Sequence, residues 1–330
     1  MSTKKKVTQA DCNPFPQSDT NKRYYTYDYY LRRRYGEKCA KIPLNAGLTC
    51  PNIDGSKGSG GCIYCSSAGS GDFTLGSHLS LSRQYEEQRA RMGDKWKPRL
   101  FIPYLQAHTN TYADKETLTR LYRELAALPD ACAVHIATRA DCLPSYALDL
   151  LAELAEQTDL VVELGLQSVH EETANLINRC HGYGDFLRGY EALRRASDKI
   201  GICVHLINGL PGESEDMMLT SARLVGALAP DQIKLHLLHV LQGTRLAQMY
   251  LRGEYLPMQE DAYVSVLLRQ LEIIPKDTVI GRLTGDGKRE ELLAPTWSLR
   301  KLSVIDHLDR LMYEKDTWQG KYAEKQVSFV

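Results

Sequence analysis

Residues 160–207 read LVVELGLQSVHEETANLINRCHGYGDFLRGYEALRRASDKIGICVHLI, and this stretch decides the fold class. It opens on an apolar run at 160–166 and closes on a second run at 200–207, and both have the length of buried strands. Between them, residues 171–197 carry apolar side chains at helical spacing. Because a strand, a helix and another strand in succession join parallel strands by a right-handed crossover, the stretch predicts an α/β fold with a parallel sheet.

The same alternation extends toward both ends of the chain. Four further apolar runs predict strands at 41–48, 100–105, 133–137 and 232–240. Helical patterns lie between the runs, at 82–93, 114–128, 145–156 and 213–228. Six such units are too few for the closed eightfold barrel, so we expect a partial (β/α)6 TIM-type barrel. The loops at the carboxyl ends of its strands should carry the functional residues.

The pattern divides the chain into three parts. We expect a basic N-terminal extension over residues 1–40, a core domain over 41–285 and a C-terminal helical extension over 286–330. Residues 1–45 hold 10 basic and 4 acidic side chains, a local charge of +6. Such a segment can be attracted to phosphate, but it is more typical of a solvated, partly disordered leader. It therefore supports an RNA substrate only weakly.

The composition limits the class of protein. The chain has 330 residues, of which 43% are hydrophobic and 25% charged, which is typical of a globular protein and not of a disordered or fibrous one. Its 41 basic side chains balance 41 acidic ones, so no overall charge indicates nucleic acid. No run approaches the roughly 18 apolar residues of a membrane span, and the N-terminus lacks an apolar signal segment. We expect a cytoplasmic protein without a membrane partner.

Three cysteines share one glycine-rich loop directly after the first strand, Cys50-Pro-Asn-Ile-Asp-Gly-Ser-Lys-Gly-Ser-Gly-Gly-Cys62-Ile-Tyr-Cys65. A [4Fe–4S] cluster held by three thiolates keeps one iron free of protein ligands, and that iron can bind a small molecule. The glycines let the backbone approach an inorganic cluster closely. The alternative is structural zinc, with Cys39 as the fourth ligand. Cys39 precedes the strand and Cys50 follows it, which makes a shared tetrahedral site geometrically awkward.

With this loop, the sequence resembles the radical S-adenosylmethionine (SAM) superfamily, and more closely the bacterial subfamily that includes YhcC and MnmL and is related to the radical SAM domain of the Elongator catalytic subunit. The spacing C-x11-C-x2-C departs from the usual C-x3-C-x2-C of the superfamily and matches the subfamily. The resemblance covers about residues 25 to 285. It is carried by the cysteine loop and by the motifs YLQAHTNTYA, ATRADCLP, ELGLQSVHEET, HLINGLPGE, KLHLLHVLQGT and GRLTGDG.

The resemblance implies that Cys50, Cys62 and Cys65 hold a [4Fe–4S] cluster whose open iron binds the methionine part of SAM. An electron from the cluster would cleave SAM to a 5′-deoxyadenosyl radical, since the cofactor supplies the hard chemistry. It also implies a flavodoxin or ferredoxin-type electron donor.

The other strand ends would then hold parts of SAM. Tyr64 and the backbone at Gly209 would lie near the adenine. Glu163 and Gln167 face the same side of one strand and would bond the ribose, with Ser168 following them. The remaining contacts are with the methionine part. Its amino group would contact Gln106, Thr109 and Asn110, although turn capping explains any one of these three equally well. Its carboxylate would pair with Arg179. The alternative interpretation of Arg179 is a surface charge at a helix end.

The substrate implied by the MnmL-type members is the wobble uridine of tRNA, with conversion of a 5-carboxymethylaminomethyl group to 5-aminomethyl. Two alternatives stay open. One is a radical SAM enzyme that acts on a small metabolite or another base. The other is a zinc-stabilised RNA-binding module without radical chemistry. Four further cysteines lie after the predicted second strand. They lack ligand spacing and are interpreted as structural, namely Cys132, Cys142, Cys180 and Cys203.

Overall fold

A curved parallel sheet of seven strands forms the centre of the computed structural model, which describes residues 13–66, 69, 73–96, 98–285 and 287–323. Every neighbouring pair in the sheet is parallel. In sheet order the strands are β1 (Cys39–Leu44), β2 (Leu100–Leu105), β3 (Ala133–Thr138), β4 (Asp159–Gln167), β5 (Ile200–Asn208), β6 (Gln232–Leu237) and β8 (Val279–Arg282). The predicted partial TIM-type barrel is confirmed. It has one strand more than predicted, because β8 follows the six expected ones.

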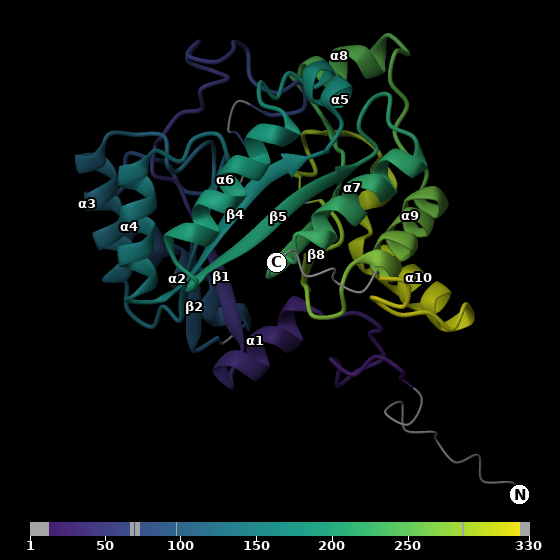
Figure 1. Cartoon of the computed structure of the whole chain (residues 1–330), viewed down its shortest axis with the longest axis horizontal. Helices are drawn as coiled ribbons and strands as arrows, with labels where there is room; N and C mark the ends of the chain where they lie inside the picture. The colour runs from purple at the N-terminus through teal and green to yellow at the C-terminus, as the bar shows by residue number, and fades with distance from the viewer. Residues whose placement is uncertain (1–12, 67–68, 70–72, 97, 286, 324–330) are drawn as a thin grey trace, which may run out of the picture.

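Helices cover the outer face of the sheet (Figure 1). They are α2 (Leu81–Trp96), α3 (Lys115–Ala126), α4 (Ser145–Ala155), α6 (Tyr183–Ala196), α7 (Glu215–Ala227) and α9 (Glu260–Ile273). The strands turn alternate apolar side chains toward this layer, and Val162 and Leu164 of β4 and Ile202 and Val204 of β5 are fully buried there. The main hydrophobic core therefore lies between the sheet and the helices, outside the barrel.

The other face of each strand lines the barrel interior and is polar. Since successive side chains of a strand point to opposite faces, β4 directs Glu163 inward between the outward Val162 and Leu164. β5 likewise directs Cys203 and His205 inward. Branched apolar residues dominate the interior of most barrels of this type, so these polar positions need a separate explanation.

Part of the basic N-terminal stretch is folded, contrary to the expected leader. Helix α1 (Tyr27–Tyr35) buries Leu31 and contacts both edge strands, β1 and β8. Just before it, Thr26 forms a parallel bridge with Ile280 of β8. Tyr24 is 4% exposed. This segment therefore packs at the amino ends of the strands, where Figure 1 shows α1 below β1 and β2. Residues 1–12 of the predicted extension lie outside the described residues.

The segment expected as one helix at 171–197 is two, α5 (Glu171–Leu176) and α6. The chain turns sharply between them because Asn178 and Cys180 adopt positive φ angles of 57° and 59°, which the α-helix does not allow. Gly182 is the N-cap of α6, and its backbone N–H donates to Asp185 at 2.9 Å. The break places Arg179, one of the predicted site residues, in a loop.

The C-terminal segment packs onto the barrel. It contains β9 (Leu292–Ala294), the 3-10 helix η2 (Thr296–Leu299) and α10 (Lys301–Glu314). The predicted run at 232–240 ends in a separate strand, β7 (Val240–Leu241), which pairs antiparallel with β9 and precedes α8 (Arg245–Leu251). Helix α10 lies against α9 and buries three side chains completely, Val304, Leu308 and Met312. Among the described helices, none has the length and apolar character needed to cross a membrane.

Candidate functional site

The three loop cysteines lie together at the carboxyl end of β1. The thiols of Cys62 and Cys65 form a hydrogen bond, and Cys50 interacts electrostatically with Cys65. The bond from Cys65 lowers the pKa of Cys62 to about 7, although burial opposes this shift. A half-buried group of three sulfurs, one of which ionises readily, is suited to bind a soft metal or an iron–sulfur cluster.

The loop is fastened to the break between α5 and α6. The Asn52 amide donates to the backbone oxygens of Asn178 at 2.8 Å and Arg179 at 2.9 Å, and its nitrogen lies 3.7 Å from Cys62 Sγ. In return, the Asn178 side chain donates to Gly61 O at 2.7 Å. Only glycine fits at position 58 without a steric clash, since a Cβ there would lie 2.5 Å from Cys180 Sγ. The cysteine loop and the loop of Arg179 therefore form one packed unit.

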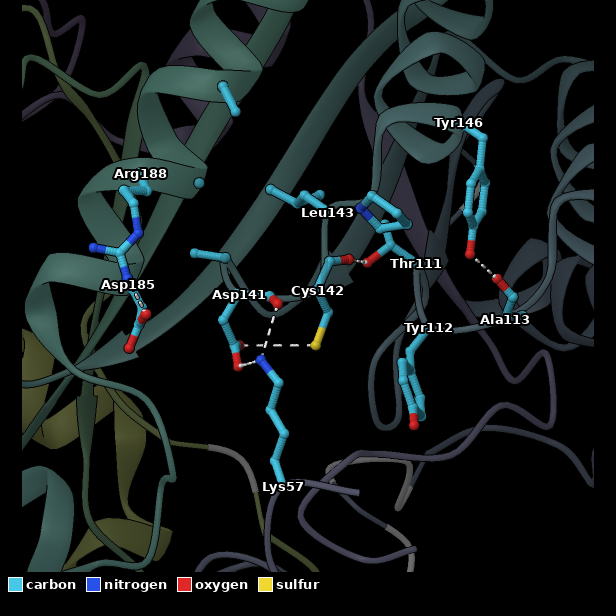
Figure 2. Close-up of a pocket in the computed structure, with 14 residues that line it drawn as sticks. Lys57, Thr111, Tyr112, Ala113, Asp141, Cys142, Leu143, Tyr146, Asp185 and Arg188 are labelled. Carbon is cyan, nitrogen blue, oxygen red and sulfur yellow. Dashed lines mark hydrogen bonds and ion pairs between the residues drawn. The ribbon is translucent and has the colours of Figure 1, made fainter. Parts of the chain in front are cut away.

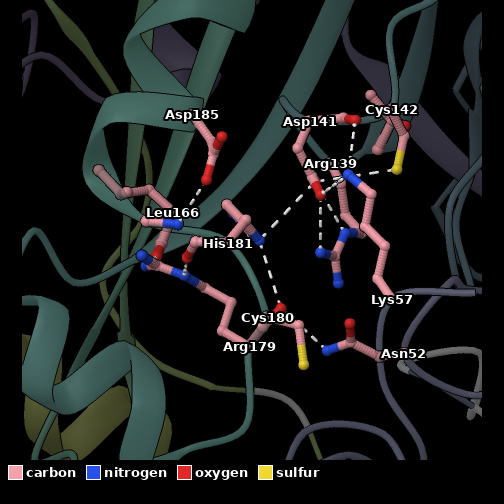
Figure 3. Close-up of polar contacts among 12 residues, drawn as sticks. Asn52, Lys57, Arg139, Asp141, Cys142, Leu166, Arg179, Cys180, His181 and Asp185 are labelled. Carbon is pink, nitrogen blue, oxygen red and sulfur yellow. Dashed lines mark hydrogen bonds and ion pairs between the residues drawn. The ribbon is translucent and has the colours of Figure 1, made fainter.

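A charged network fastens the same loop to the end of β3 (Figure 3). Arg139 donates twice to the Asp141 carboxylate, at 2.9 and 3.0 Å, and Lys57 of the cysteine loop donates to it at 2.5 Å. Burial alone would raise the pKa of Asp141, but these bonds hold it below its usual value. The remaining arm of Arg139 points to Cys50, with Nη1 3.9 Å from Sγ. A guanidinium in this position is suited to stabilise negative charge on a sulfur ligand.

The loop after β2 brings the predicted polar residues next to the cysteines. The Thr109 backbone N–H donates to Thr49 O at 3.2 Å, immediately before Cys50. Thr109 and Asn110 are each 1% exposed, and the hydroxyl of Thr109 and the amide oxygen of Asn110 have no hydrogen-bond partner. Gln106 is half-buried at the start of this loop. Buried polar atoms rarely lack partners, so a ligand group is the natural explanation for these two.

Arg179 is the most informative of the predicted residues. Its side chain is 2% exposed, and it donates to three backbone oxygens, those of His181 at 2.9 Å, Ser168 at 2.6 Å and Leu166. Nη2 has no partner, and no carboxylate pairs with the guanidinium within the described part of the chain. Burial lowers the pKa of Arg179 from its ordinary value. Glu171 and Glu213 act on it only at longer range, and a buried cation without a directly paired carboxylate is costly and indicates an anionic ligand.

The remaining predicted residues surround this position. Gln167 ends β4 with a positive φ of 68°, and the Ser168 hydroxyl bonds to the Glu213 carboxylate. Gly209 has a φ of 84°, and a Cβ there would lie 3.0 Å from Met258 Cγ, so only glycine fits without strain.

Tyr64 packs against the small cluster of buried apolar residues around Ile63 and Leu246. Burial, and then the charges of Cys62 and Cys65, raise the pKa of Tyr64. The phenol therefore stays protonated beside the thiols.

Glu163 does not have the free carboxylate that a ribose contact requires, so the structure does not support that prediction. One oxygen is bonded by Lys41 Nζ at 2.8 Å and His135 Nδ1 at 2.6 Å. The other is bonded by His205 Nε2 at 2.7 Å and by Lys234. The side chain is completely buried in the barrel interior, four residues before the end of β4. It belongs to a different group of residues from the strand-end loops.

A cavity of about 790 Å³ lies beside the charged network (Figure 2). Lys57, Asp141 and Cys142 form its wall toward the cysteine loop, and Asp185 and Arg188 of α6 face them. None of the predicted SAM contacts lines it. It is therefore separate from the position where the atoms without hydrogen-bond partners converge.

Sequence reasoning missed the residues that support the loop, namely Asn52, Lys57, Arg139 and Asp141. Arg139 directly follows β3, and strand ends were expected to carry the site, so that rule could have singled it out. The contacts of Asn52 are about 127 residues away along the chain, and no local pattern reveals them. Cys39 lies at the other end of β1, 3.7 Å from Cys132 Sγ, and cannot complete a zinc site with the loop.

Comparison with known proteins gives the family. The model of the radical SAM superfamily matches residues 55–225, and that of the radical SAM C-terminal domain matches residues 230–314. The chain belongs to the radical SAM superfamily. It is 44% identical to YtqA of Bacillus subtilis over 313 residues, which cover 95% of this chain and 97% of YtqA. It is 32% identical to YhcC of Escherichia coli K12, covering 86% and 90%. The resemblance inferred from the motifs is thus confirmed.

More distant proteins share the fold. The solved structure of archaeal Elp3 from Methanocaldococcus infernus superposes with a TM-score of 0.63 at 19% identity, over 85% of this radical SAM chain and 64% of that one. A protein of the same organism named tRNA uridine(34) acetyltransferase is 29% identical over 157 residues, which cover 47% of this chain and 28% of that protein.

Proposed function

We propose that this radical SAM protein binds a [4Fe–4S] cluster through Cys50, Cys62 and Cys65, with SAM beside it. The donor set suits such a cluster, because three thiols meet in a loop where Gly58 and its neighbours admit close packing. When bound, the pair of cofactors supplies reductive cleavage of SAM, which starts radical chemistry on a substrate carbon. The chain itself binds and orients the cofactors and limits access of water.

Arg179 is the observation that carries the proposal. Its buried guanidinium lacks a carboxylate, and the methionine part of SAM has one. The atoms of Thr109 and Asn110 without partners suit the methionine amino group, with Gln106 beside them. Gln167 and Ser168 would face the ribose, and Tyr64 and the Gly209 backbone the adenine. Arg139 would stabilise the thiolate of Cys50 and so favour cluster binding.

We further propose that the substrate is the wobble uridine of tRNA and that the reaction converts its 5-carboxymethylaminomethyl group to 5-aminomethyl. The similarity to the protein named tRNA uridine(34) acetyltransferase and the fold shared with Elp3 support this substrate class. A flavodoxin or ferredoxin-type protein would supply the electron. Another modified base or a small metabolite is the alternative substrate. A control with tRNA that lacks the 5-carboxymethylaminomethyl group distinguishes the proposed substrate from these alternatives.

The cofactor proposal is tested by anaerobic reconstitution followed by iron and sulfide analysis. We expect about four irons and four sulfides per chain and an EPR spectrum that changes when SAM is added. The matched control is Cys180→Ala, because Cys180 packs against Gly58 of the cysteine loop without belonging to the triplet. This variant should keep its iron, whereas Cys62→Ala should lose it. One tightly held zinc and no iron in the intact protein would overturn the proposal.

A further inference from the structure

The barrel interior holds a group of ionisable side chains that the proposed cofactor site does not use. Four donors surround the Glu163 carboxylate, and they come from four strands, β1, β3, β5 and β6. Glu163 is fully buried, Lys234 is 5% exposed and His135 is 2% exposed at the side chain. A barrel filled by apolar side chains would be less costly, so this arrangement indicates a binding function.

The group carries more positive than negative charge. Burial lowers the pKa of His135 to about 3 and that of His205 to about 4, so both imidazoles are neutral at physiological pH. Burial also lowers the pKa of Lys41 to about 8, so this amine still carries its proton at pH 7, and Lys41 and Lys234 face the single carboxylate of Glu163. A buried excess of one positive charge is unfavourable unless a second anion compensates it.

Helix α1 closes the group at the amino ends of the strands, and the Tyr104 ring of β2 lies 4.9 Å from both ammonium groups. On the closed side, the Tyr27 hydroxyl of α1 donates to His135 Nε2 at 3.1 Å, and the Tyr27 ring covers the Lys41 ammonium at 4.9 Å. On the other side, His236 of β6 lies one inward position nearer the carboxyl end than Lys234. Its ring is 5.2 Å from that of His205, and its buried Nε2 has no partner. His236 is therefore the next inward residue of β6 toward the end where the cysteine loop lies.

We propose that Lys41 and Lys234, held by Glu163, form a recognition site for a carboxylate of the substrate inside the barrel. The inference rests on the proposed function, since the carboxymethylaminomethyl group has a carboxylate that the aminomethyl product lacks. The substrate group is a zwitterion whose carboxylate the excess positive charge attracts, whereas the product group carries only a cationic amine, which the same charge repels. His236 Nε2 lacks a partner and 23% of the Lys41 side chain is exposed, so both would be available to the incoming group.

A metal ion is a weaker explanation of the same residues. Donor atoms of Glu163, Cys203 and His205 lie within 4.8 Å of one another, as a metal site requires. However, two ammonium groups already bond the same carboxylate and would repel a divalent cation. An anion is the ligand that the local charge favours.

The test measures how the full-length protein binds two anticodon stem-loop RNAs that differ only at the wobble uridine. One carries the 5-carboxymethylaminomethyl group and the other the 5-aminomethyl group. We expect the intact protein to bind the first RNA about 10- to 150-fold more tightly, the range for hydrogen bonds to charged groups. Lys234→Met should reduce this preference to about twofold or less by removing the excess charge. Lys199→Met, which removes an exposed lysine paired with Glu156, should preserve it.

A second variant separates charge from folding. Lys234→Met combined with Glu163→Gln restores one excess positive charge and leaves no unpaired carboxylate, so the preference should return. Equal affinities for the two RNAs in the intact protein, or a preference that survives Lys234→Met, would overturn the inference. Incubating the same RNA with reconstituted enzyme, SAM and reductant tests the proposed function independently. Conversion without a lysine-dependent preference overturns only the carboxylate site, and a lysine-dependent preference without conversion overturns only the proposed reaction.

Discussion

Replacing Arg179 by methionine should weaken SAM binding by removing the guanidinium proposed to pair with its carboxylate. The free Nη2 can form at least one charge-assisted hydrogen bond, and such a bond contributes about 1.5–3 kcal/mol. Since about 1.4 kcal/mol corresponds to a factor of ten, SAM affinity should fall about 10- to 150-fold. Arg179→Lys keeps the charge but not the planar geometry, and its affinity should be intermediate.

Arg179 also holds backbone oxygens of Ser168 and His181, so a loss of affinity could follow from a disturbed loop. Titrating each variant with SAM and with decarboxylated SAM separates the two effects. The intact protein should prefer SAM, and Arg179→Met should bind both ligands about equally. Arg188→Met, which removes an exposed arginine of α6, is the control and should keep the preference. An unchanged preference in Arg179→Met would refute the proposed pairing.

Three other predictions concern cluster binding, packing and pH. Substitution of any loop cysteine by alanine should reduce the iron bound after reconstitution to less than about a tenth of that in the intact protein. Cys180→Ala should keep its iron, and equal iron in all four variants would contradict the assignment. Gly58→Ala should lower the free energy of unfolding by about 1–3 kcal/mol, since its Cβ would lie 2.5 Å from Cys180 Sγ. Combining it with Cys180→Ala should restore stability in urea denaturation, and no rescue would exclude this clash as the cause. Burial lowers the pKa of His205 to about 4 in the folded protein, whereas in the unfolded chain its pKa is near 6.5. Because the unfolded chain binds the proton first, the free energy of unfolding should fall as the pH decreases below 6.5. His205 should contribute about 1.4 kcal/mol per pH unit to the fall in the free energy of unfolding. The prediction would be refuted if His205→Gln and the intact protein lost stability with pH at the same rate.

The strands that could be predicted are those with long apolar runs. β2, β4 and β5 are buried on their outer face over their whole length, and the runs at 100–105, 160–166 and 200–207 report this burial. β8 has only four residues, of which Val279 and Ile280 are buried, so no run marks it. Helix α1, YDYYLRRRY, buries only Leu31, and its contacts with two distant strands hold it in place.

The candidate site divides in the same way. The cysteine triplet is visible because its spacing is local, and Thr109 could be expected because it follows the end of a strand, whereas Arg179 came only from the family resemblance. The partners of Glu163 could not be predicted, because Lys41 lies 122 residues before it and Lys234 lies 71 residues after it. Only the curvature of the sheet brings these side chains together. The sequence pattern alone therefore favoured a ribose contact that the folded barrel does not leave free.

Mass spectrometry of nucleosides from total tRNA tests the central claim most directly. Cells that lack this protein should accumulate the 5-carboxymethylaminomethyl nucleoside at the expense of the 5-aminomethyl one. The intact protein should reverse the change, and a variant with alanine at the three loop cysteines should not. A wobble-nucleoside profile that is the same with and without the protein would contradict the proposed substrate.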